Sequence, residues 1–500
     1  MNVKEELLVK RPFYKTAPYG REEEPVQSVD TMKYRERSIC GTPLTQADFI
    51  EWFYPSSSKV MSQFWFPDKL NYGKVVTEDG EEIETMYRQS VFRVSCPIPA
   101  FITTQRISHL TGNDVRHELT DSTINTATEE NFRMMLQGWY AKGMEVAIYK
   151  FIKSQLITVD SAIVFYMNNG KMNWKVLSYL DGDTLYPHYN PITGEQDGLA
   201  RKFTSYDEEG KALTTWVEYW DDRYLWRFKQ TQYGIHSALN KAFDFLGLDN
   251  FKLVSKTEHG APFCPAVYFR NPSNLPCYGN VIDLIDNYNV ALSYLCQNNM
   301  AYAFPIMLLS GDEIDIKGDM YGQVKAVTMG KEDKVAYLEQ QGTAENFKLQ
   351  LEELLKQIFW GAFAVVPPEL KSGDLPGIAV KLIYSPSVEI AQTEAKELQQ
   401  AINDIVTLFK HFYGTEIGKV TAFDSMQTLS FIEPYIHQSN TETITNLVAS
   451  VNTGILSKQT ASELTGYDRT NEWDKIISER KQEEAADRLY QLKSGLSITK

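Results

Sequence analysis

The sequence lacks the features that tie a chain to an oxidising compartment or to a membrane. Its five cysteines are odd in number and widely separated, which predicts free thiols of a protein assembled in the cytoplasm, not a disulfide framework. No apolar run approaches the roughly 18–20 residues needed to cross a bilayer, so no membrane partner is expected. The first residues, MNVKEELLVKRPFYK, contain no apolar stretch typical of a signal peptide.

Basic residues are also fewer than acidic ones. The 50 Lys and Arg residues are outnumbered by 65 Asp and Glu, which gives a net charge of −15 at pH 7. This balance argues against a simple nucleic-acid-binding surface, which is normally basic. It is compatible with a protein that lets nucleic acid pass without gripping it, because strong phosphate contacts are made by Lys and Arg.

Recognisable catalytic and nucleotide-binding motifs are missing. The sequence contains no G-x-G-x-x-G, G-x-S-x-G or H-E-x-x-H. Its nearest approach to a P-loop, GTEIGKV at 414–420, is one residue short and ends in Val420 where a hydroxyl would hold Mg²⁺. No cysteine pair has the spacing of zinc ligands. We therefore expect no metal, no cofactor and no catalytic residue.

Three short stretches are the nearest to a chemical site. His109 and His117 in HLTGNDVRH, with Asp114 and Glu118, have the donor types of a metal site, but the stretch is more typical of an exposed polar loop. Paired acids suited to glycoside hydrolysis occur in YLDGDTLY and WDDRY, where Asp also favours hairpin turns. The aromatic residues near the second pair indicate either a stacking surface or ordinary cross-strand pairs.

The length and the hydrophobic pattern predict several subdomains. A chain of 500 residues exceeds the size of a single growing core, so two to four subdomains are expected. A polar, charged arm opens the chain and is followed by a helix in TPLTQADFIEWFYP, capped by Thr45 and stopped by Pro55. Apolar residues at helical spacing predict a longer helix over 128–155.

Between 156 and 270 the hydrophobic period changes to two, which predicts strands. SAIVFYMNNGKMNWKVLSYL indicates a hairpin with Asn169-Gly170 at its turn. Three further antiparallel strands are expected in GLARKFTSYDEEGKALTTWVEYWDDRYLWRFKQ, one turn falling at Asp221-Asp222. The strands alternate with turns and not with helices, which argues against a parallel Rossmann-like sheet.

Helical periodicity returns after residue 279. Two helices are predicted over 279–303 and 343–364, separated by Gly-rich residues with short β-like pieces. Each helix carries an apolar stripe. The stripes include Ile285, Tyr288 and Leu292 in the first helix and Leu351, Leu354 and Ile358 in the second. Such stripes indicate either ordinary core packing or contact between subunits.

A third, long helix is predicted over 387–413, with heptad-like apolar repeats and an end at Gly414. It follows the loop FAVVPPELKSGDLPGIAVKLIYSPS at 363–387, which is too long for a turn and too apolar for a solvated linker. We therefore expect this loop to lie against another surface. Two helices, punctuated by Gly454 and Gly466, and a charged helix follow.

This order of parts resembles the portal proteins of tailed bacteriophages. CPAVYFRNPSNLPCYGNVIDLIDNYNVALS is similar to the family's last wing strand and first stem helix, with an apolar-Ile-Asp-x-Tyr-Asn signature at 284–289. SGDLPGIAVKLIYS resembles its tunnel loop, and NTGILSKQTASELTGYD resembles a helix–turn–helix near its C-terminus. The similarity covers roughly residues 150–480, and the first 120 residues match less clearly.

The resemblance implies an α+β fold with an antiparallel β-rich wing, a two-helix stem, a small α/β clip, a long spine helix and a helical crown. The implied parts are an N-terminal arm at 1–40, the wing at 41–275, stem helices at 276–303 and 343–364, the clip at 304–342, the tunnel loop at 365–384, the long wing helix with its connection at 385–425, and the crown with the tail at 426–500.

The resemblance also gives the expected site residues. In a ring, the tunnel loop would project toward DNA with residues that bend it or face the duplex, namely Glu369, Lys371, Gly373, Asp374, Pro376 and Gly377. The apolar stripes of the two stem helices would then be shared between neighbouring subunits. No residue is expected to catalyse a reaction.

Finally, the resemblance implies a place and partners. Family members form a twelve-subunit ring at one capsid vertex of the virion, assembled in the host cytoplasm, through which double-stranded DNA passes without sequence preference. The expected partners are the terminase large subunit, a head-completion or adaptor protein, and the major capsid and scaffold proteins. The alternatives are a non-portal structural adaptor of a large assembly, or a carbohydrate-active enzyme with its site on the 156–230 sheet.

Overall fold

A computed structural model describes most of the chain. The described residues are 46–61, 66–76, 82–120, 126–207, 212–231, 250–303, 307–310, 315–318, 324–328, 334–337, 343–366, 377–435, 440–457, 461 and 476–482. The chain divides into two compact units, one formed by 1–366 with 386–435 and the other by 367–385 with 436–500. Helices and antiparallel strands both occur among the described residues, as expected of an α+β protein.

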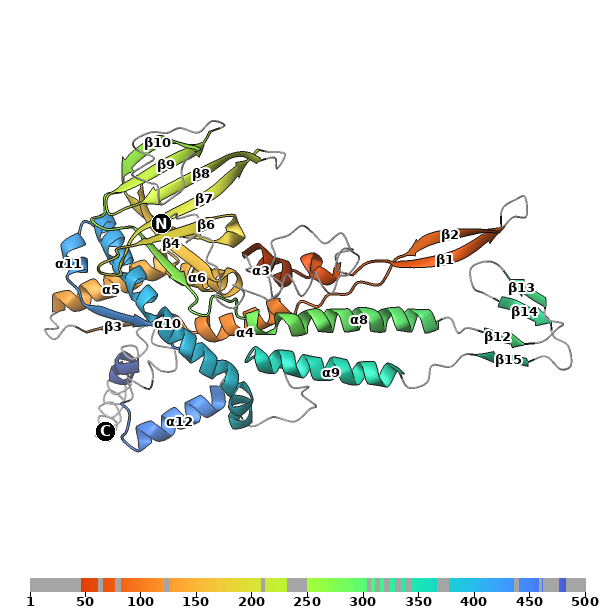
Figure 1. The fold of residues 1–500 in the computed structure, drawn as a ribbon. Coiled ribbons are helices and arrows are strands. Elements are labelled where there is room, and N and C mark those ends of the chain that lie inside the picture. Colours follow the sequence, from red (N-terminus) through yellow and green to blue (C-terminus); the bar gives the residue numbers. More distant parts are fainter. Residues whose placement is uncertain are drawn as a thin grey trace, which may run out of the picture. The chain divides into compact units, whose positions relative to one another are not determined.

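Two antiparallel sheets form the β-rich part of the first unit (Figure 1). The larger sheet has the order β10-β9-β8-β7-β6 and consists of β6 (Thr184–Tyr189), β7 (Gln196–Tyr206), β8 (Ala212–Trp220), β9 (Tyr224–Gln230) and β10 (Phe251–Glu258). The smaller sheet has the order β11-β4-β5 and consists of β4 (Asp160–Asn168), β5 (Lys171–Leu177) and β11 (Ala266–Arg270). The predicted Asn169-Gly170 turn is confirmed, since both residues have the positive φ that a tight hairpin turn requires.

Helices cover the smaller sheet and form the main core with it. That core contains side chains of α5 (Thr126–Ala141), α6 (Met144–Thr158) and the long helix α10 (Gly377–Ile417). Fully buried aromatic residues occupy its centre, namely Trp139, Phe151, Phe165, Phe409 and Phe412. The apolar heptad-like pattern of α10 thus serves this core.

The single helix predicted over 128–155 is two helices. Gly143 adopts φ 66°, a left-handed conformation that an α-helix cannot contain, and it separates α5 from α6. The break lets Glu145 in the first turn of α6 accept a hydrogen bond of 2.6 Å from the indole nitrogen of Trp139 in α5. Apolar residues keep helical spacing on both sides of Gly143, so the periodicity predicted one helix although the glycine itself was a sign of the break.

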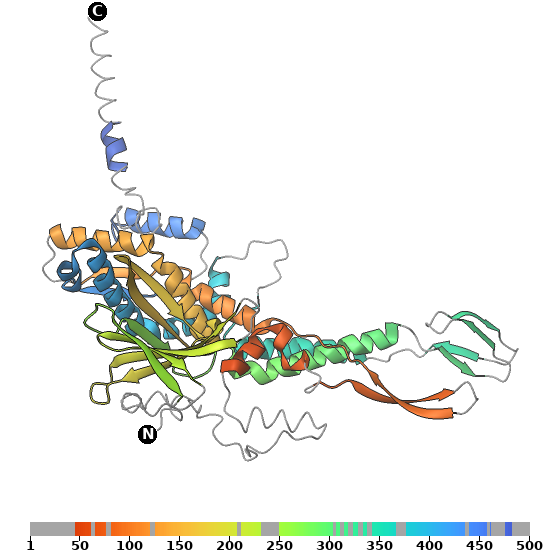
Figure 2. The same ribbon diagram turned by 90° about the horizontal axis from the view of Figure 1, so that it is seen from above.

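The predicted stem consists of α8 (Ile282–Ala303), preceded by a 3-10 turn at Gly279–Val281, and α9 (Thr343–Gly361). The two helices lie side by side in both views (Figure 1, Figure 2). Their buried faces meet α3 (Gln46–Phe53) and α4 (Ile98–Thr111) in a second core around Tyr278, whose hydroxyl donates to the Phe49 carbonyl at 2.9 Å.

Between α8 and α9 the described residues form four short strands and no helix. β12 (Met307–Ser310) pairs with β15 (Lys334–Tyr337), and β13 (Asp315–Gly318) pairs with β14 (Val324–Thr328). The sequence predicted short β-like pieces here. It did not predict a hairpin of β1 (Lys69–Val76) with β2 (Glu82–Gln89), nor the pairing of β3 (Arg116–Leu119) with β16 (Thr428–Phe431).

Both predicted ends of the long helix are wrong. Helix α10 already begins at Gly377, so the loop expected over 365–384 is shorter, and it ends at Ile417, past Gly414. Gly414 has a different purpose, because a Cβ there would lie 3.0 Å from the backbone of Val420 in α11 (Val420–Asp424). Pro386 lies inside α10 and has no N–H for the Leu382 carbonyl, which accepts a 3.1 Å bond from Ser385 Oγ.

The described residues of the second unit include α12 (Asn440–Asn452), which ends before Gly454 at φ 74°. The helix punctuated by Gly454 in the sequence is thus present. Gly466 and the predicted helix before it lie largely outside the described residues.

Candidate functional site

Most of the predicted DNA-facing residues fall on the connection between α9 and α10 that the structure does not describe. Glu369, Lys371, Gly373, Asp374 and Pro376 lie outside the described residues, so their role stays a prediction. Gly377 is the first residue of α10. The structure does describe 362–366, the root of this connection on the α9 side.

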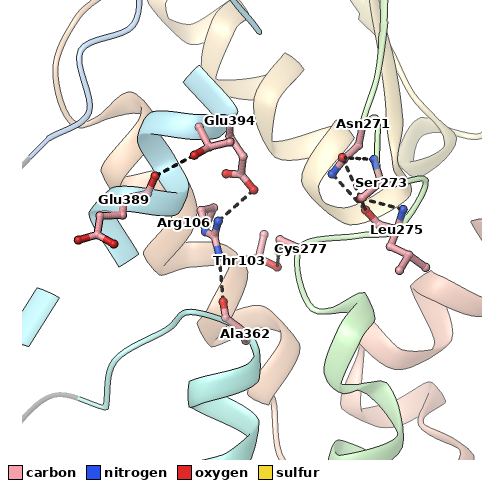
Figure 3. Close-up of polar contacts among 10 residues, drawn as sticks. Thr103, Arg106, Asn271, Ser273, Leu275, Cys277, Ala362, Glu389 and Glu394 are labelled. Atoms are coloured by element: carbon pink, nitrogen blue, oxygen red, sulfur yellow. Dashed lines mark hydrogen bonds and ion pairs between the residues drawn. The ribbon is translucent and has the colours of Figure 1, made fainter. Parts of the chain in front are cut away.

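Helix α4 holds that root by its backbone. The Gln105 side chain donates from Nε2 to the Val365 carbonyl at 3.2 Å and accepts from the Val365 N–H at 2.8 Å. One amide side chain thereby satisfies both backbone groups of Val365, as a neighbouring strand would. One residue along, Arg106 donates to the Ala362 carbonyl at 2.9 Å, at the end of α9 (Figure 3).

The same arginine joins α4 to α10. Arg106 makes an ion pair of 3.0 Å with Glu394, and the two side chains are only 4% and 13% exposed. Burial raises the pKa of the Glu394 carboxyl, and the charge and hydrogen bond of Arg106 oppose that rise. The second oxygen of Glu394 has no hydrogen-bond partner among the described residues. We call Gln105, Arg106 and Glu394 the α4 clamp.

The six predicted stem-contact residues divide into two groups. Ile285, Leu351 and Ile358 are buried by this chain alone, and Ile285 and Ile358 belong to the core around Tyr278. Tyr288, Leu292 and Leu354 are only half-buried and keep apolar surface exposed. The second group is therefore the one available for contact with another molecule.

A row of polar residues on α8 accepts hydrogen bonds from other segments of the chain. This row was missed in the sequence because only the apolar stripe of the helix was considered. Asp286 accepts from the indole N–H of Trp52 at 3.2 Å, and Asn289 Oδ1 accepts from the Cys96 N–H at 3.0 Å. Ser293 Oγ accepts from the Val94 N–H, also at 3.0 Å. These residues, spaced three and four apart, bind the extended segment 91–96 and α3 to α8. That helical spacing of small polar residues was the available signal.

The comparison with known families is decisive. A family model described as "Phage portal protein, SPP1 Gp6-like" matches residues 74–486, well over half of the chain. The chain belongs to the phage portal protein family. Portal proteins are structural components of the bacteriophage virion, at a capsid vertex, and the family is not enzymatic. The match begins at residue 74, well before the point at which the sequence motifs became recognisable.

Other comparisons add little to the portal assignment. A solved structure described as the neck of an empty GTA particle computed with C6 symmetry is 12% identical, with a TM-score of 0.39 over 74% of this chain and 90% of that chain. Another, described as the virion of a native gene transfer agent particle, is 12% identical, with a TM-score of 0.37 over 74% of this chain and 89% of that chain. A comparison with curated proteins finds no match.

The first of the three portal-like strings leads into α8, the first of the two predicted stem helices. Before α8, Asn271 Oδ1 accepts from the N–H and the hydroxyl of Ser273, and Asn271 Nδ2 donates to the Leu275 carbonyl at 3.1 Å (Figure 3). Cys277 follows, with its Sγ 3.2 Å from Thr103 Oγ1 on α4. Burial raises the pKa of the Cys277 thiol to about 12, so it stays protonated and inert.

The stretches weighed as chemical sites have structural contacts in this portal protein. Nδ1 of His109 lies 2.8 Å from the Tyr435 carbonyl, and Nδ1 of His117 lies 2.8 Å from Ser430 Oγ. Asp221 accepts from the Arg223 N–H at 2.8 Å, as a turn aspartate does. Within the described ranges, no cluster of three His, Cys, Asp or Glu could hold a metal, and no helix is long and apolar enough to cross a membrane.

Proposed function

We propose that this portal-family protein forms a twelve-subunit ring through which double-stranded DNA is packaged and later ejected. Family membership over residues 74–486 supports the ring. The observation that carries the channel role is the α4 clamp. It ties Val365, on the α9 side of the connection, to the same helix that holds Glu394 of α10.

The α4 clamp would hold the root of the α9–α10 connection in position while DNA moves past it. Arg106 and Glu394 are buried, and a buried ion pair is costly to break by removing one partner. A loop whose root is fixed in this way can contact DNA without moving the helices beneath it. In the proposed ring, Lys371 supplies weak phosphate contacts, and Glu369 and Asp374 keep the contacts from becoming strong.

Segment 304–342 is proposed as the clip that docks the terminase large subunit and later an adaptor protein. Its described strands pair only in twos, and an isolated two-stranded hairpin is marginally stable in water. Neighbouring copies in the ring would therefore order it. The β-rich wing would face the capsid and scaffold proteins.

Electron microscopy of the purified protein, together with a packaging assay, tests this proposal. We expect ring particles from the wild type. Deletion of 314–335 should leave the first unit folded and abolish DNA packaging, because the motor loses its docking site. A wild type that remains monomeric at every concentration would falsify the ring, and normal packaging by the deletion variant would place motor docking elsewhere.

A further inference from the structure

Two aromatic side chains protrude at the end of α9. Trp360 is 83% exposed and Phe363 is 47% exposed. A tryptophan carries one of the largest apolar surfaces of any residue and is normally well buried. Exposure to this extent, next to a second exposed aromatic residue, is typical of a contact surface.

Phe363 is also held in a strained conformation. Its φ of 52° is left-handed, and it ends α9 together with a bond of 2.9 Å from the Ala364 N–H to the Phe359 carbonyl. Glycine or asparagine normally occupies such a helix end, because a bulky side chain there is disfavoured. Strain at an exposed aromatic residue points to a function for that side chain.

A matching groove lies along a different side of α4. It has a volume of about 450 Å³ and is lined by Phe53 of α3, by Tyr149 and Lys153 of α6, by Tyr435 after β16, and by small and polar side chains of α4. The Lys153 ammonium lies 5.9 Å from the Tyr149 ring centre. Aromatic walls with a nearby cation suit an inserted aromatic ring, because cations are attracted to ring faces.

Helix α4 contacts the root of the α9–α10 connection with one side and lines the groove with another. Gln105 points to the root of the α9–α10 connection, whereas Thr103 and Ile107 line the groove. Each is two residues from Gln105, which corresponds to about 200° around an α-helix. Thr104, Ser108, Thr111 and Gly112 line the groove as well, so it covers a broad arc of α4 that includes the side away from Gln105. One chain therefore carries a projection and a separate receiving surface, which allows a head-to-tail contact between copies.

We propose that Trp360 and Phe363 of one copy insert into the groove lined by Phe53, Tyr149 and Tyr435 of the next copy. This inference rests on the proposed ring and specifies one of its contacts. A second copy suits the protrusion better than DNA does, because the two side chains are uncharged and phosphate recognition depends on Lys and Arg. The protrusion is aromatic and the groove presents three aromatic side chains, so apolar surface on both sides loses water on contact.

A charge-reversal experiment tests the pairing. Trp360→Lys places a second cation in the groove next to Lys153 and should raise the concentration needed for ring formation at least tenfold. Lys153→Glu combined with Trp360→Lys should restore ring formation, because the two charges are then opposite. Leu349→Lys, on the same exposed face of α9 three turns earlier, is the matched control, and Lys153→Glu should not alter its effect. Mass photometry over a dilution series reads out all the variants.

A second variant separates contact from folding. Phe363→Gly removes the strained φ, so the melting temperature of the subunit should stay equal or rise while ring formation weakens. If the wild type forms rings and Trp360→Lys forms them equally well, the inference is wrong. It is also wrong if Lys153→Glu fails to rescue Trp360→Lys, since another surface then receives Trp360. Absence of rings in the wild type would instead overturn the proposed function.

Discussion

Arg106 shows how one residue can set the position of three elements. Its guanidinium is shared between the Ala362 carbonyl and the Glu394 carboxylate, and it is almost fully buried on α4. Removing two charges from water costs about as much as their attraction returns, so the pair adds little net stability. The planar guanidinium has donors in fixed directions, so it fixes how α10 and the end of α9 are placed against α4.

Replacing Arg106 should therefore be costly although the pair contributes little. We expect Arg106→Met to lower the free energy of unfolding by about 3–5 kcal/mol, because a buried carboxylate loses its partner. Burial raises the pKa of Glu394, so the loss should shrink at low pH, where the carboxyl is protonated, and grow as pH rises through the raised pKa. Hydrogen exchange of α4 peptides measures the effect.

The control uses an exposed pair. Arg116 and Glu118 are 49% and 44% exposed at 3.1 Å, so Arg116→Met should cost less than about 1 kcal/mol. Equal losses for the two arginine variants would show that the clamp does not fix its elements.

At the scale of elements, α8 and α9 serve two purposes with neighbouring faces. Ile285 and Ile358 complete the core around Tyr278, while Leu292 and Leu354 keep part of their surface exposed. The apolar stripe seen in the sequence therefore includes both the residues that pack in the core and the residues that remain available for contact with another subunit. Periodicity identifies such a stripe but cannot divide it, since both faces are apolar.

Aspartate substitutions should separate the two faces. Ile358→Asp places a charge in the core and should unfold the stem, with loss of helical circular dichroism. Leu292→Asp and Leu354→Asp should keep the helical signal and shift the protein from ring to monomer in sedimentation. Rings formed by both leucine variants would remove these side chains from the subunit contact.

Local sequence signals predicted most of the helices and the strands of the two larger sheets, whereas features that depend on distant contacts were missed. Asn169-Gly170 and Pro55 act within a few residues, so the hairpin turn and the end of α3 near them were predictable. Thr45, the predicted cap of α3, lies outside the described residues. Gly414 is different, because its small size is required by α11 and the left-handed residue that follows α10 is Gly418. The α4 clamp was missed for the same reason, since nothing near Arg106 in sequence shows that its partner is Glu394.

At the scale of the whole molecule, charge limits how DNA can be held. Twelve copies of a −15 chain would carry roughly −180 in one ring, which repels phosphates over distances set by the ionic strength. In such a field one lysine per copy is a weak, sequence-independent contact. The proposed channel is thus suited to sliding.

Reversing the charge of Lys371 should reduce DNA packaging. Lys371→Glu is expected to leave ring assembly intact and to lower the amount of packaged DNA or its retention, more so at low salt, where charges are less screened. Lys229→Glu, an equal charge change at an exposed position of β9, is the control. If Lys371→Glu and deletion of 370–376 both package and retain full-length DNA, the loop does not touch the duplex.

The pairing of β3 with β16 also has a consequence for biosynthesis. His117 on β3 and its partner Ser430 on β16 are 313 residues apart in the chain. At about 5–20 residues per second on the ribosome, β3 waits on the order of 15–60 seconds for its partner strand to be made. During that time its open edge can pair with the same strand of another nascent chain. We therefore expect pairing between nascent chains to compete with ring assembly, and capture of this segment by a chaperone to raise the yield of rings.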